Sequence, residues 1–116
     1  MLDLAPSLSA MSHLIAHRGP DGEGQWQNPR GSIGLVHRRL AIIDLSEAAA
    51  QPMSGVNDTV ITYNGEIYNY KELRSALAEH WSFRSHSDTE CILAAYEHYG
   101  EACLEHLRGM FAFALW

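Results

Sequence analysis

The sequence is poor in the features that mark secreted, membrane-spanning and nucleic-acid-binding proteins. Only 2 of its 116 residues are cysteine, and 8 Lys and Arg stand against 14 Asp and Glu, giving a formal charge of −6. The low cysteine content excludes a disulfide-rich scaffold, and the acidic balance argues against binding to phosphate backbones. No apolar run approaches the roughly 18 residues that span a bilayer, and the N-terminal segment lacks the basic and apolar regions of a signal peptide. A cytoplasmic protein is therefore expected.

The two cysteines and the seven histidines show no metal-binding pattern. Cys91 and Cys103 lie twelve residues apart in segments of helical character, without CxxC spacing, and are predicted to be reduced and buried. His13 and His17 have the i, i+4 spacing that lets two imidazoles share a metal on one helix face. No third ligand accompanies them, so ordinary packing or capping is the preferred interpretation and no metal is expected.

Short segments of mixed helical and strand character predict one α+β domain. The hydrophobic content of 47% is that of a globular chain with a single core. Asn69-x-x-Glu72 and Ser87-Asp88-Thr89-Glu90 have the form of capping boxes at helix starts. The expected elements are helices over 8–16, from 70 to about 81, from 88 onward and over 101–107, with strands at 25–26, 33–37, 59–63 and 82–85.

The last seven residues, MFAFALW, are apolar on both faces. This pattern predicts a central buried strand rather than an edge strand. Exposed strands of this kind aggregate. We therefore expect the chain to be a fragment that ends inside its domain.

Four polar clusters fall at predicted strand ends or in turns. They are HRGPDG at 17–22, HRRLAIID at 37–44, NGE at 64–66, and Ser87-Asp88. Taken singly, each has a simple structural interpretation: a helix exit with a turn, a solvated basic pair, an Asn-Gly hairpin turn, and a carboxylate facing a helix dipole. No single cluster identifies a function.

Together, six strings resemble one known domain family. AHRGPDGEG, HRRLAIIDLS, QPM, YNGEIYNYKELR, HSDTE and LRGMFAFALW, in this order, are similar to the glutaminase domain of glutamine-hydrolysing asparagine synthetases. That domain is a class II glutamine amidotransferase, an N-terminal-nucleophile hydrolase. The resemblance covers about residues 14 to 116 and implies a four-layer α/β/β/α sandwich of mostly antiparallel sheets, incomplete here. It implies hydrolysis of glutamine to glutamate and ammonia, with which a separate synthetase domain amidates aspartate at the expense of ATP.

The resemblance also implies a glutamine-binding site. Arg39 would pair with the α-carboxylate of glutamine, because a guanidinium fork suits a carboxylate. Glu66 and Asp88 would hold the α-ammonium group. The remaining residues implied for the pocket are Leu40 and Ile42, through their backbone groups, and Arg18 in support.

The catalytic groups implied by the resemblance are only partly present. The side-chain amide of Asn64 and the N–H of Gly65 would form the oxyanion hole. The nucleophile of the family is an N-terminal cysteine whose own α-amino group, with a pKa of about 8, acts as the base. This sequence begins Met-Leu-Asp. Cys91 and Cys103 are not expected to replace that cysteine, so the chain is expected to be inactive alone.

The sequence predicts no cofactor in this chain. It contains neither an ATP-pyrophosphatase signature nor a GxxxxGK[ST] loop, so ATP and Mg²⁺ are assigned to the absent synthetase domain. Residues 1–116 are expected to be a partial amidotransferase domain, with glutamine and the synthetase domain as partners and a tendency to self-associate through exposed strands. Two alternatives stay open: a non-catalytic glutamine-binding or scaffold protein, and the amidotransferase-like domain of a related synthetase that amidates peptides or forms lactams.

Overall fold

The chain alternates short helices with two antiparallel sheets. The structure, a computed structural model, describes residues 3–40 and 46–116. In chain order the elements are α1 (Ala5–Leu14), η1 (Ala16–Arg18), β1 (Gly22–Gln27), β2 (Gly34–Arg39), η2 (Glu47–Ala49), β3 (Met53–Ser54), β4 (Val60–Ile67), α2 (Tyr70–Leu77), α3 (Asp88–Tyr99), η3 (Gly100–His106) and β5 (Gly109–Leu115). The sheet orders are β1-β2 and β3-β4-β5. The predicted α+β class is confirmed.

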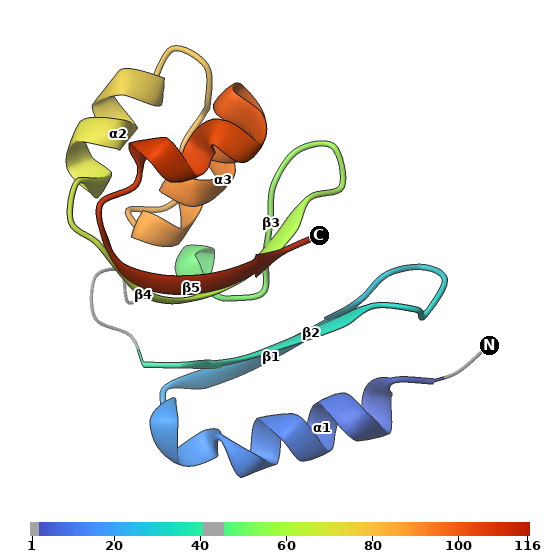
Figure 1. The fold of residues 1–116 in the computed structure, drawn as a ribbon. Helices are drawn as coiled ribbons and strands as arrows, with labels where there is room; N and C mark the ends of the chain where they lie inside the picture. Colours follow the sequence, from blue (N-terminus) through green and yellow to red (C-terminus); the bar gives the residue numbers. More distant parts are fainter. Residues whose placement is uncertain (1–2, 41–45) are drawn as a thin grey trace.

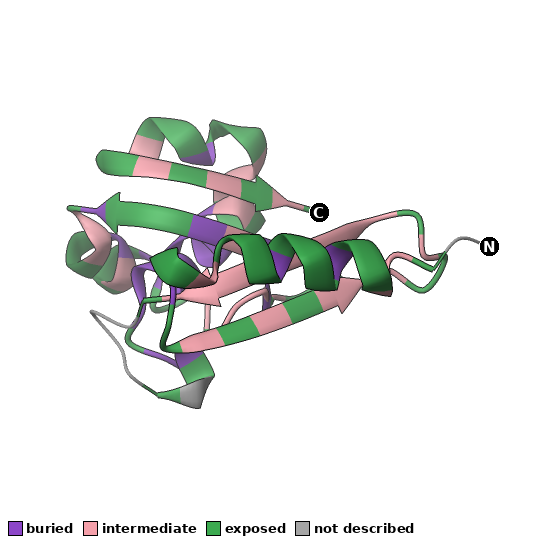
Figure 2. Cartoon of the chain, turned by 90° about the horizontal axis from the view of Figure 1, so that it is seen from below, coloured by how far each residue is buried: buried purple, intermediate pink, exposed green. Residues whose placement is uncertain are grey.

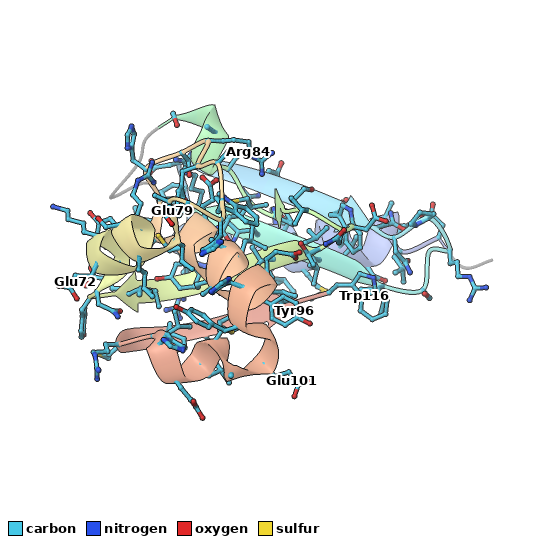
Figure 3. All side chains as sticks on the ribbon, turned by 90° about the horizontal axis from the view of Figure 1, so that it is seen from above. Glu72, Glu79, Arg84, Tyr96, Glu101 and Trp116 are labelled. Carbon is cyan, nitrogen blue, oxygen red and sulfur yellow. The ribbon has the colours of Figure 1, made fainter. Side chains whose placement is uncertain are left out.

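The two sheets lie between helices (Figure 1). Helix α1 packs on β1 and β2, and β2 contacts β4 of the second sheet. Helix α3 packs on the other side of β4, and α2 and η3 in turn contact α3. The outward faces of α2 and η3 carry charged side chains such as Glu72 and Glu101, which project from the helices (Figure 3). The space between β2 and β4 is therefore the inside of this arrangement.

Alternation along β4 divides its side chains between the two neighbouring layers. Ile61, Tyr63 and Ile67 are buried in the main core, which β5 completes with Phe111, Phe113 and Leu115. The intervening residues face β2, as the 3.1 Å contact between Thr62 Oγ1 and His37 Nδ1 shows. Period-two alternation thus gives β4 an apolar face toward the helices and a polar face toward the other sheet.

Helix α1 covers the outer face of the first sheet. Leu8 and Ser12 are its buried residues, and the rest of the helix is mostly exposed (Figure 2). A Cβ at Gly34 of β2 would lie 2.9 Å from Leu8 Cδ1, so a larger residue there would require the Leu8 side chain to shift. Arg38 donates from Nε to the carbonyl oxygen of Ser12 at 3.0 Å and pairs with Glu23 at 3.2 Å. These contacts fix the strand that continues to Arg39.

Two predicted strand assignments are wrong. The MFAFALW segment forms β5, which occupies an edge of the described sheet rather than its centre. Residues 82–85 form no strand. The N–H groups of Arg84 and Ser85 instead donate to the carboxylate of Glu90, at distances from 2.8 to 3.1 Å, so a side chain has taken the place of a strand partner.

The Asn64-Gly65 pair does not form a turn or end a strand. Strand β4 runs on to Ile67, and Asn64 and Gly65 pair with Ala112 and Phe111 of β5. Gly65 has φ of +142°. An added Cβ there would lie 2.2 Å from the carbonyl oxygen of Met110, so glycine is required for strand pairing and not for a hairpin.

Across residues 3–40 and 46–116, every helix is too short or too polar to span a membrane.

Candidate functional site

A cavity of about 600 Å³ opens between the two sheets. Strand β2 forms one wall, and β4 with β5 forms the other. At Ala112 and Ala114, β5 presents only methyl groups to the cavity, which leaves room beside the polar face of β4. The described residues predicted for the site all line this cavity: Arg18, Arg39, Leu40, Asn64, Gly65, Glu66 and Asp88. Ile42 lies outside the described residues.

Asn64 and Gly65 lie side by side on the wall formed by β4. In β4, the N–H groups of Tyr63 and Ile67 point away from β5, to Gln51 Oε1 at 2.6 Å and to Asp88 Oδ2 at 3.2 Å. Because hydrogen bonding alternates along an antiparallel strand, the N–H of Gly65 is directed to this same side. Its role and that of the Asn64 amide as an oxyanion hole remain predictions.

Asp88 is the buried carboxylate of the cavity, with 5% of its surface exposed. It is the first residue of α3, after Ser87, whose side chain accepts the N–H of Glu90 at 3.3 Å. Both recorded hydrogen bonds of Asp88, from the Tyr63 hydroxyl at 2.5 Å and from the Ile67 N–H, are made to Oδ2. In the part of the chain that the structure describes, Oδ1 has no recorded protein partner and can accept from a ligand.

The opposite wall of the cavity is cationic. Arg39 ends β2 and donates from Nη1 to the carbonyl oxygen of Ser46 at 2.8 Å. Arg18, at the end of η1, is exposed and lines the same space. Burial, together with the nearby charge of Arg39, lowers the pKa of His37 below 6.5, so this imidazole is neutral near pH 7.

The charges in the cavity are segregated. Arginines come from η1 and β2, and the carboxylates of Glu66 and Asp88 come from β4 and the start of α3. A ligand with a carboxylate at one position and an ammonium group at another would meet opposite charges at both. The arrangement therefore suits a free amino acid. In the described residues, no group of three or more His, Cys, Asp or Glu side chains is placed to hold a metal ion.

Comparison with known proteins identifies the family. Residues 2–116 match the family described as glutamine amidotransferase domain. The chain belongs to this family. The amidotransferase resemblance inferred from the six strings is therefore confirmed, and the cavity is that of a glutamine amidotransferase domain.

Named relatives of this amidotransferase domain include synthetases and amidases. Asparagine synthetase [glutamine-hydrolyzing] 1 of Bacillus subtilis is 47% identical over 111 residues, which cover 94% of this chain and 17% of that protein. Asparagine synthetase B [glutamine-hydrolyzing] of Escherichia coli is 40% identical, over 99% of this chain and 20% of that protein. Amidase chry2 of Gibberella zeae is 46% identical, over 89% of this chain and 16% of that protein. The chain thus spans a fifth or less of the length of these relatives.

The two cysteines of the amidotransferase domain are buried and unpaired, as predicted. Neither lines the cavity. Burial raises the pKa of Cys91 to about 12, and burial also raises the pKa of Cys103. Since the thiolate is the reactive form of cysteine, both thiols have the character of core residues rather than nucleophiles.

Sequence reasoning missed several polar residues around the amidotransferase cavity. Gln51 accepts the Tyr63 N–H through Oε1 and donates from Nε2 to Thr89 Oγ1 at 3.2 Å, which joins β4 to the start of α3. Gln51 lies in the QPM string and His37 begins the HRRL string. Their place in these family strings could have indicated that both residues lie at the site. For Tyr63, the signal was its place before Asn64-Gly65, but its partner Asp88 is 25 residues away.

Proposed function

We propose that this chain is the glutaminase portion of an asparagine synthetase, which hydrolyses glutamine to glutamate and ammonia for the ATP-dependent amidation of aspartate. The observation that carries the proposal is the segregation of charge in the cavity of a glutamine amidotransferase domain. Arg39 takes the α-carboxylate of glutamine, and Glu66 with Oδ1 of Asp88 takes the α-ammonium group. This orientation directs the side-chain amide of glutamine along β4 toward Asn64 and Gly65.

In the proposed chemistry, the protein stabilises negative charge on the amide oxygen of glutamine. A nucleophile attacks the amide carbon, and the oxygen gains charge that the Gly65 N–H and the Asn64 side-chain amide receive by hydrogen bonding. Ammonia leaves, and water releases glutamate. The nucleophile of this class is an N-terminal cysteine, and the buried Cys91 and Cys103 do not supply it.

We further propose the architecture of the domain, its partner and its location. The two sheets and their covering helices are part of a four-layer α/β/β/α sandwich of the N-terminal-nucleophile hydrolase type. Residues 1–116 are a partial amidotransferase domain whose partner is a synthetase domain that holds ATP and Mg²⁺, and no cofactor is assigned to this chain. A cytoplasmic location accompanies this assignment.

The ligand assignment is tested by isothermal titration calorimetry with L-glutamine. Saturable binding is expected, and replacing the guanidinium in Arg39→Ala should weaken it by about tenfold or more, the cost of a charged hydrogen-bonded pair. The matched control is Arg30→Ala, because Arg30 is exposed and does not line the cavity. Absence of glutamine binding by the unaltered chain would contradict the proposal.

The hydrolytic step is tested by an ammonia-release assay. Residues 1–116 alone are expected to release no ammonia. A version extended upstream with Met-Cys-Gly-Ile-Ala-Gly and downstream by the continuation found in the relatives is expected to be active, and its Asn64→Ala variant should lose about 100-fold or more in rate. Ammonia release by residues 1–116 alone would show that a different nucleophile operates.

A second candidate function differs in the ammonia acceptor. The 46% identity to Amidase chry2 and the 43% identity to Amidase chyE of Penicillium rubens favour it, because similarity alone does not separate amidases from synthetases here. In this alternative the domain serves a related enzyme that amidates a peptide or closes a lactam. A non-catalytic glutamine-binding or scaffold role would instead give calorimetric binding with no ammonia release in either version.

A further inference from the structure

Tyr63 occupies a buried position that links β4 to the start of α3, on one side of the ligand site. Only 5% of its surface is exposed. Its backbone N–H is held by Gln51 Oε1 at 2.6 Å, and its hydroxyl donates to Asp88 Oδ2 at 2.5 Å. The residue is therefore anchored at its backbone and at the far end of its ring.

The hydrogen bond from Tyr63 acts on one oxygen of Asp88. Oδ2 accepts both the Tyr63 hydroxyl and the Ile67 N–H, and two donors on one oxygen fix the plane of the carboxylate. Asp88 lines the cavity, and its Oδ1 is the carboxylate oxygen that these two hydrogen bonds leave able to accept from a ligand. A carboxylate fixed in this way can accept a hydrogen bond from an ammonium group without losing rotational freedom when the ligand binds.

We propose that Tyr63 is a positioning residue that orients the Asp88 carboxylate and so gives the site its selectivity for a free α-amino group. This inference rests on the proposed binding of glutamine. Tyr63 has no need to touch the ligand, because its effect passes through Asp88.

The protonation state of the Tyr63 hydroxyl suits a role as hydrogen-bond donor to Asp88. Burial, the hydrogen bond to Asp88 and the charges of Asp88 and Glu66 all raise the pKa of Tyr63 well above its usual value of 10. The hydroxyl therefore keeps its proton throughout the neutral range. It remains a donor to Asp88, and it never adds a third negative charge beside the two carboxylates.

The main test compares two ligands that differ only in the α-amino group. L-glutamine and glutaramate, which is glutamine without that group, are titrated by calorimetry into the unaltered chain and into Tyr63→Phe. The variant is expected to lose about tenfold or more in affinity for glutamine, the cost of a hydrogen bond to a charged group, and less than about twofold for glutaramate. The matched control is Tyr68→Phe, since Tyr68 is 63% exposed and lies outside the cavity.

The possible outcomes separate this inference from the function on which it rests. If the unaltered chain does not bind glutamine, the proposed function fails. If the chain binds glutamine and Tyr63→Phe binds both ligands as the unaltered chain does, or loses affinity for both equally, only the positioning role fails. An equal loss would mean that Tyr63 merely supports the shape of the cavity.

Two further variants test the route of the effect. In Asp88→Asn, adding Tyr63→Phe should cause little further loss of glutamine affinity, because the two changes disrupt one interaction. Replacement of Tyr63 by 4-aminophenylalanine keeps a donor at the ring and is expected to retain the preference for glutamine over glutaramate, which also covers the case in which Tyr63→Phe does not fold. Additive losses in the double variant, or loss of the preference with the amino-substituted ring, would overturn the inference.

Discussion

At the scale of single residues, Gly65 has the most restrictive backbone in the site. Its φ of +142° is open to glycine and strained for other residues, and its Cβ position is filled by the backbone of Met110 and Phe111. The residue whose N–H is proposed for the oxyanion hole therefore also sets how closely β4 and β5 approach each other.

Gly65→Ala should for this reason lower the free energy of unfolding by about 2 kcal/mol or more, the sum of backbone strain and a forced separation of strands. Gly22→Ala is the matched control, since a Cβ at Gly22 would lie at an ordinary 3.7 Å from Arg39 Cβ. Urea denaturation followed by circular dichroism measures both. Equal stability of the two variants would show that the strands adjust freely.

The two thiols allow a second test at this scale. Because burial raises the pKa of Cys91 to about 12 and also raises that of Cys103, little thiolate exists near pH 8. Reaction with Ellman's reagent should be slow in the folded chain and complete within the mixing time of manual assays in guanidinium chloride. Rapid labelling of one thiol in the folded chain would contradict its assignment to the core.

At the scale of elements, the segment before α3 depends on a single buried carboxylate. Glu90, with 1% of its surface exposed, accepts from Trp81 Nε1 and from the N–H groups of Arg84 and Ser85. Burial alone would raise the pKa of Glu90, but the hydrogen bonds from Ser85, Trp81 and Arg84 outweigh it and lower the pKa below 4.5. The ionised form therefore stabilises the segment that leads to Asp88.

The pH dependence follows from this direction. A carboxyl group whose pKa is lower in the folded chain stabilises it above the unfolded pKa of about 4.5, and this stability is lost as pH falls through the folded value. Glu90→Gln should cost about 2 kcal/mol at pH 7 and should flatten the decline of stability below pH 4.5. Thermal melts from pH 3 to 7 measure this, with exposed Glu79→Gln as the control.

Local sequence patterns predicted some elements and failed for others, depending on how far along the chain the deciding contact lies. The start of α3 was predictable, because Ser87 caps it through a contact three residues away. The structure of residues 82–85 was not predictable, because the N–H groups of Arg84 and Ser85 donate to a side chain on the next helix, that of Glu90. Likewise, Asn64-Gly65 has the composition of a turn, but pairing with Phe111 and Ala112 of a distant strand overrides that preference.

At the scale of the whole molecule, the chain exposes apolar side chains along β5. Met110 is 73% exposed and Trp116, next to the end of β5, is 54% exposed (Figure 3). An edge strand with such side chains can pair with another copy. Self-association, predicted from the sequence, remains to be tested.

Sedimentation velocity over a range of concentrations is the measurement. The chain is expected to form larger species as concentration rises, and Met110→Lys should reduce them, because a charge on an edge strand opposes pairing. Leu104→Lys is the control, since Leu104 is 55% exposed but lies on η3. A monomer at all concentrations would argue that the edge is protected.

The order of strands in the sheets was harder to predict from the sequence than the residues of the candidate site. The order β3-β4-β5 and the edge position of β5 depend on which strands meet, which an alternation pattern does not encode. The residues predicted for the site were found by family resemblance instead. Local physics alone gave each of Arg39, Asn64 and Asp88 a simple structural interpretation, because their convergence requires contacts among β2, β4 and α3.

The location of the cavity between two sheets has one more consequence. Arg39 and Leu40 belong to the side of β2, whereas Glu66 and Asp88 belong to the side of β4 and α3. A ligand that contacts both sides crosslinks the two halves of the protein without a covalent bond. By linkage, any change that destabilises the contact between the two sheets lowers the affinity for the ligand. Binding of the ligand in turn stabilises that contact. Occupancy of the site and contact between the two sheets are then coupled equilibria, each of which favours the other.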